Sequence, residues 1–62
     1  MDEIDKLKVL LAHWIEHNRQ HTNRYKEWIL KAGDAEKSLN DAVMYSDKVN
    51  DSLSTALFKL GG

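Results

Sequence analysis

The stretch "AGD", residues 32–34, contains the only glycine in the interior of the chain, because the other two glycines are its last two residues and proline is absent. Gly33 suits the left-handed backbone conformation that ends a helix, and Asp34 is a residue type that caps the start of the next helix. We therefore predict a helix over residues 3–32, a turn at 33–34 and a second helix over 35–60. A connection this short makes the two helices antiparallel.

Both halves of the chain carry apolar residues three and four positions apart, which is the spacing of a helix with one buried face. The alternating pattern that strands require is missing. On the first half, the predicted face consists of Leu7, Leu11, Trp14, Asn18, His21, Tyr25, Trp28 and Ala32. On the second half, it consists of Ala35, Leu39, Ala42, Val43, Ser46, Val49, Asn50, Leu53, Ala56, Leu57 and Leu60. The sequence predicts an all-α protein, an antiparallel two-helix hairpin spanning residues 1–62 as one domain.

A hairpin of 62 residues has a thin core, and chains of this size usually need a disulfide, a metal or a partner chain. The apolar arc of the first helix is wider than one neighbouring helix can bury. We therefore expect a homo-oligomer, most simply a dimer that forms a four-helix bundle. The residues expected at its interface are Trp14, Ile15, Ile29, Met44 and Phe58.

Four polar residues fall on the two apolar faces and meet at one level when the chain is folded about its turn. They are Asn18 and His21 on the first helix and Ser46 and Asn50 on the second. Buried polar groups must be hydrogen-bonded, or each costs a few kcal/mol. A fully paired polar layer fixes the register of the helices and the choice of partner.

All three histidines lie in "HWIEHNRQH", residues 13–21, at i, i+4 and i+8. Neighbouring pairs, His13 with His17 or His17 with His21, are spaced to share one metal ion, for which zinc, nickel and cobalt are the candidates. "HWIEH" also matches the H-x-x-E-H pattern of inverted zinc proteases, which needs a third ligand, an open coordination position and a cleft. Two helices offer no walls for a cleft, so the prediction is a non-enzyme without a required cofactor.

Charge and composition narrow the range of partners. The net charge of −1 argues against a surface for nucleic acid, and no apolar run approaches the roughly 20 residues that span a bilayer. The acidic start, "MDEIDKLK", does not resemble a secretory signal, and the absence of cysteine fits a reducing compartment. We expect a cytoplasmic protein whose partner is a second copy or another protein.

The pattern L-x-x-HWIEHN-x-x-H-x-x-x-Y-x-x-W, from Leu10 to Trp28, precedes a glycine turn and a helix with Leu39, Asn50 and Leu53. This arrangement resembles a small, poorly characterised family of prokaryotic helical-hairpin proteins. The resemblance implies the hairpin fold and gives weight to the histidine stretch, but it transfers no reaction.

Two functions are consistent with the sequence. The first is a non-enzymatic module for oligomerisation and protein interaction. The alternative is a small metal-binding protein that uses His13, His17 and His21. The amount of metal in the purified protein and its oligomeric mass discriminate between these two functions.

Overall fold

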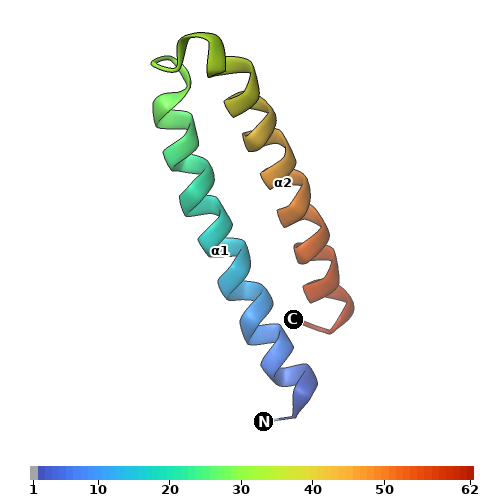
Figure 1. Cartoon of the computed structure of the whole chain (residues 1–62). Coiled ribbons are helices and arrows are strands. Elements are labelled where there is room, and N and C mark those ends of the chain that lie inside the picture. The colour runs from blue at the N-terminus through green and yellow to red at the C-terminus, as the bar shows by residue number, and fades with distance from the viewer. Residues whose placement is uncertain (1) are drawn as a thin grey trace.

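The computed structural model describes residues 2–62, and Met1 lies outside the described residues. Figure 1 shows two long helices side by side, with the turn at one end and both termini at the other. The elements are α1 (Glu3–Ile29), a short 3-10 helix η1 (Gly33–Ala35) and α2 (Glu36–Lys59). Over residues 2–62 the fold contains no strand, so the predicted all-α class and two-helix packing are confirmed.

The first helix starts and ends for identifiable reasons. At its N-terminus, the Asp5 backbone N–H donates to an Asp2 carboxylate oxygen at 2.8 Å, which satisfies one of the free donors of the first turn. Near the turn, α1 ends at Ile29, three residues earlier than predicted. Lys31 and Ala32 continue with tighter bonds, donating their N–H groups to the carbonyls three residues before them.

The turn depends on Gly33, whose φ of 55° lies in the left-handed region that the sequence predicted for it. The expected role of Asp34 as the cap of the second helix is wrong. Asp34 lies inside η1, and α2 starts from Ala35 without a side-chain cap. The short 3-10 turn between the helices takes the place of that cap, since the Ala35 N–H donates to the Ala32 carbonyl at 3.0 Å.

The far end of α2 closes with a Schellman motif. Gly61 has a φ of 84°, its N–H donates to the Phe58 carbonyl, and the Gly62 N–H donates to the Leu57 carbonyl, both at 3.0 Å. A Cβ on Gly62 would lie 2.4 Å from a methyl carbon of Leu57, so this position has room only for glycine unless the leucine moves.

The seam between the helices is the core of the hairpin, and it is rotated on α1 relative to the prediction. Its buried members are Leu11, Ile15 and Thr22, at 3%, 7% and 5% exposure. Trp14 and Trp28, expected to pack against α2, are 40% and 61% exposed. The expectation that they form the hairpin core is therefore wrong, and Tyr25 is likewise exposed. At about 100° per residue, Leu11, Ile15 and Thr22 fall together at one edge of the wide apolar arc of α1. This edge is the part of α1 that contacts α2.

We predict that Gly33→Ala lowers the free energy of unfolding by about 1 kcal/mol, because a left-handed backbone is unfavourable for a residue with a Cβ. A Cβ at Gly33 would have no atom within 4 Å, so the loss reports backbone conformation alone. Gly33→Asn is the matched control and should lose less, since asparagine tolerates this conformation better. Denaturant titration at one protein concentration measures both, and an alanine variant as stable as the parent would contradict the assigned turn.

We also predict that Asn50→Ala destabilises the protein by about 1–3 kcal/mol, because it leaves the part-buried Asn18 amide without its partner. Asn40→Ala makes the same chemical change at an exposed position of α2 and should alter stability by less than about 0.5 kcal/mol. Chemical denaturation of both variants provides the comparison. Equal effects would show that the seam does not depend on the asparagine pair.

Candidate functional site

Two hydrogen-bonded pairs cross the seam and set the register of the helices. The Asn18 side-chain amide donates to the side-chain carbonyl oxygen of Asn50 at 2.9 Å. The side-chain amide of Asn50 in turn donates to the backbone carbonyl of Ile15 at 3.1 Å. One helical turn further along α1, the Thr22 hydroxyl donates to the Ser46 hydroxyl at 2.8 Å. These contacts contain three of the four residues expected in the polar layer, arranged as two levels instead of one.

The remaining residue of that expected layer, His21, lies outside the seam. It is half-buried, and its hydrogen-bond partner is His17 on the same helix, not Ser46. Thr22 takes the place expected for His21, and it is the residue that sequence reasoning missed. Its spacing of seven from Ile15 and four from Asn18 carried the signal, but the weight given to the large aromatic residues shifted the predicted face toward His21 and away from Thr22.

The histidines form a row along α1 that continues into Tyr25. Nε2 of His17 and Nε2 of His21 lie 2.9 Å apart, with ring centroids 4.5 Å apart. The His13 ring is 5.9 Å from that of His17, and Tyr25 stacks 6.3 Å from His21 on the other side. Two of the three expected ligands therefore come together closely, and His13 stands apart. Within residues 2–62, no three histidine or acidic side chains are grouped to hold an ion.

This row belongs to a second stripe on α1, displaced about a quarter turn from the seam. A matching stripe lies on α2, displaced in the same angular sense. Because the helices are antiparallel, both stripes lie on the same flank of the hairpin. We call this flank the histidine–aromatic face. Its members are Leu10, Trp14, His17, His21, Tyr25 and Trp28 on α1, and Ala42, Tyr45, Val49, Ser52 and Ala56 on α2.

The residues expected at an oligomer interface are divided by the fold. Trp14 lies on the histidine–aromatic face. Ile15 is buried in the seam between the helices, which leaves it little surface for another chain, and Ile29 is half-buried. Met44 and Phe58 are exposed, as expected, but they lie on the other sides of α2.

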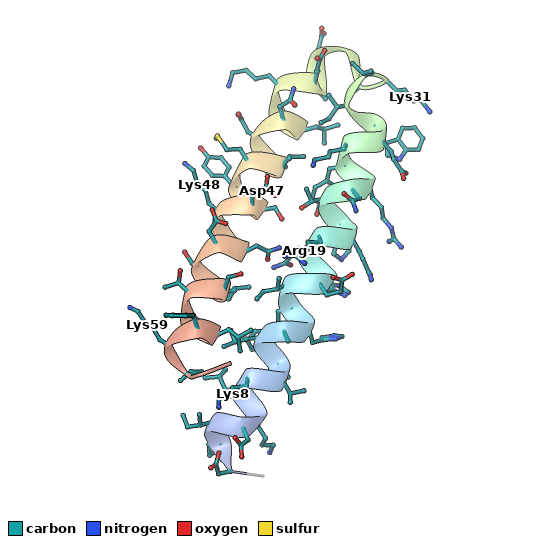
Figure 2. All side chains as sticks on the ribbon, turned by 180° about the vertical axis from the view of Figure 1, so that it is seen from behind. Lys8, Arg19, Lys31, Asp47, Lys48 and Lys59 are labelled. Carbon is teal, nitrogen blue, oxygen red and sulfur yellow. The ribbon has the colours of Figure 1, made fainter. Side chains whose placement is uncertain are left out.

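Charged side chains lie mainly away from the seam. In Figure 2, Lys48 and Lys59 project from the outer side of α2, and Lys31 projects outward from the turn that follows α1. Among residues 2–62, the ion pairs are exposed contacts within one helix, such as Lys37 with Asp41 at 3.2 Å. Pairs of this kind contribute little to stability.

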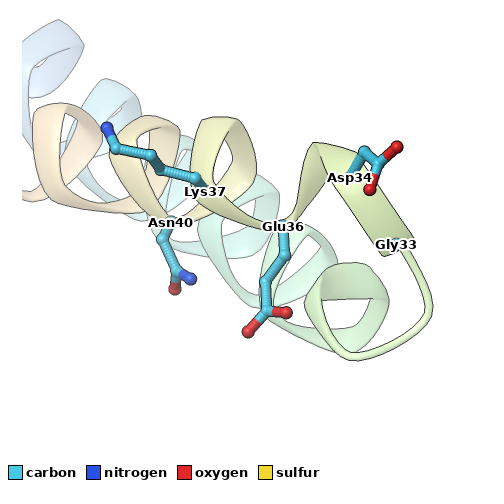
Figure 3. Close-up of a pocket in the computed structure, with 5 residues that line it drawn as sticks. All are labelled: Gly33, Asp34, Glu36, Lys37 and Asn40. Atoms are coloured by element: carbon cyan, nitrogen blue, oxygen red, sulfur yellow. The ribbon is translucent and has the colours of Figure 1, made fainter.

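A shallow, open depression lies at the turn and is lined by Gly33, Asp34, Glu36, Lys37 and Asn40. Figure 3 shows that Asp34 and Lys37 point away from Glu36 and Asn40. A ligand site needs polar groups that converge on one point, so we assign no site to this depression.

In the part of the chain that the structure describes, neither helix has a stretch long and apolar enough to cross a membrane. Neither a curated protein nor a solved structure matches the chain. A model of a protein family does match, over residues 7–60, which include both helices almost entirely and all of the histidine–aromatic face. The chain therefore belongs to the family described as a domain of unknown function, DUF8180.

Proposed function

We propose that the protein is a non-enzymatic interaction module that pairs with a second copy of itself through the histidine–aromatic face, forming a four-helix bundle. The observation that carries this proposal is the imbalance between the hairpin's core and its exposed apolar surface. Among the described residues, the buried apolar side chains are Leu11 and Ile15. Large side chains such as Trp14, Trp28 and Tyr45 remain exposed on one flank.

The dimensions of one copy support the need for a partner. Its radius of gyration is 14.4 Å, whereas a compact domain of 62 residues has about 10.6 Å. Its accessible surface is 4884 Å², whereas a compact monomer of 7.2 kDa exposes about 4,100 Å². The excess of roughly 800 Å² is close to what each partner loses in an interface of standard size. A second copy on one flank could therefore restore an ordinary ratio of surface to mass.

The face is suited to a copy of itself because its pattern is symmetric. The hydrogen bonds across the seam pair Asn18 with Asn50 and Thr22 with Ser46. In this register, position 19 of α1 lies level with Val49 of α2. Leu10 and Trp28 lie nine residues on either side of position 19, and His17 and His21 lie two on either side. On α2, Ala42 and Ala56 lie seven residues on either side of Val49.

Consider a two-fold axis that lies in the plane between the two copies at this level, perpendicular to the helices. It would pack α1 on α1 and α2 on α2 of the second copy, each pair antiparallel. Leu10 would then face Trp28 of the second copy, which pairs a smaller residue with a large one. All neighbouring helices in such a bundle are antiparallel, so their dipoles are favourably arranged. The net charge of −1 for each copy leaves little repulsion between them.

We predict that Val49→Glu dissociates the dimer, because it places two carboxylates against each other at the centre of the proposed interface. Val49 is 50% exposed in one copy, so the hairpin itself tolerates the change. Sedimentation equilibrium should give twice 7.2 kDa for the parent and 7.2 kDa for the variant at the same micromolar concentration.

Val9→Glu is the matched control. Val9 is 60% exposed and lies on the other side of α1, so this variant should keep the parent's mass. Two outcomes argue against the proposed face: a parent that is a folded monomer, and a Val9→Glu variant that dissociates as readily as Val49→Glu. The first excludes self-association and leaves a different protein as the partner.

A further inference from the structure

The His17–His21 pair has the geometry of half of a metal site. The two Nε2 atoms are 2.9 Å apart, so one imidazole N–H donates to the unprotonated nitrogen of the other. A metal ion bound by both nitrogens would replace the shared proton. A metal ion can reach the two rings without displacing a buried charged group, because the pair lies at the surface of the hairpin.

The distance between these nitrogens is compatible with shared ligation. With metal–nitrogen bonds of about 2.0–2.1 Å, two ligands at a right angle lie about 2.9 Å apart, and two tetrahedral ligands lie about 3.3 Å apart. The observed distance matches the first geometry and needs to open by only about 0.4 Å for the second. Small rotations of the two side chains are enough for such an adjustment.

A single hairpin supplies too few ligands, because no group of three or more candidate side chains is present within residues 2–62. The symmetric packing proposed above supplies the rest. His17 and His21 lie symmetrically about the level of the two-fold axis, so His17 of one copy would face His21 of the other. The four imidazoles would then surround one point at the centre of the α1–α1 contact.

We propose that this point binds a divalent transition-metal ion through His17 and His21 of both copies, and that the ion tightens the dimer. The inference rests on the proposed self-association. Neutral imidazoles without thiolate ligands suit zinc, nickel and cobalt, whereas magnesium and calcium require oxygen ligands. His13 is not a ligand of this ion, because its ring lies 5.9 Å from His17 and its side chain is further round α1 from the face.

The test is titration of the full chain with zinc chloride and, separately, nickel chloride, followed by calorimetry and by sedimentation in metal and in chelator. We expect one ion for two chains and a dimer dissociation constant at least about tenfold lower with metal. His17→Gln and His21→Gln should each weaken metal binding at least about tenfold. Mutation of a residue that only hydrogen-bonds to a metal ligand already lowers metal affinity about 10- to 100-fold. His13→Gln, which removes an exposed imidazole from the same helix, should bind like the parent.

The outcomes separate the two proposals. A chain that dimerises in chelator but binds neither ion overturns the metal site and leaves the proposed function intact. One ion for each chain, or binding that survives both His17→Gln and His21→Gln, also overturns the shared site. A chain that stays monomeric both in chelator and with metal overturns the site and the proposed function together. Circular dichroism of each variant confirms that the helices are retained.

Discussion

The Asn50 side chain is the interaction on which the rest of the hairpin depends. Its carbonyl oxygen accepts from Asn18 and its amide donates to the Ile15 backbone, so one residue of α2 contacts two successive turns of α1. A half-buried amide that lost these partners would be costly, whereas an apolar seam without them could slide by a turn with little penalty. The pair therefore fixes both the register of the helices and the edge of α1 that faces α2.

That choice of edge determines the chemistry of the surface. Because α1 uses Leu11 and Ile15 for the seam, its tryptophans and the His17–His21 pair remain on the adjacent flank. On α2, Tyr45 and Val49 are displaced from the seam in the same angular sense, so they remain exposed on that same flank. A chain of this length cannot bury two broad faces by itself. The proposed dimer and the proposed metal site both follow from this one geometric consequence of a polar pair in the seam.

The sequence was sufficient for the fold because its signals were strong and local. One internal glycine, no proline and a helical period in both halves led to the hairpin, and Gly33 adopts the expected left-handed conformation. The pairing of Asn18 with Asn50 also followed from folding the chain about that turn.

The candidate site was harder to predict, since the apolar arc of α1 is wide enough for two faces. Periodicity alone cannot decide which edge of such an arc packs inside. The large aromatic residues suggested the wrong edge, and the small buried Thr22 marked the right one. The close approach of His17 and His21, in contrast with His13, depends on side-chain rotamers, which spacing does not determine.

The central claim, that a second copy covers the histidine–aromatic face about an axis near Val49, is tested most directly by cross-linking. The chain has no cysteine, so after Val49→Cys a disulfide between two protein chains can join only this position of both copies. The account predicts rapid formation of a covalent dimer in a glutathione buffer, because residues at the axis bring their Cα atoms within the roughly 7 Å that a disulfide spans. Cross-linking no faster than that of Val9→Cys, on the other side of α1, would contradict it.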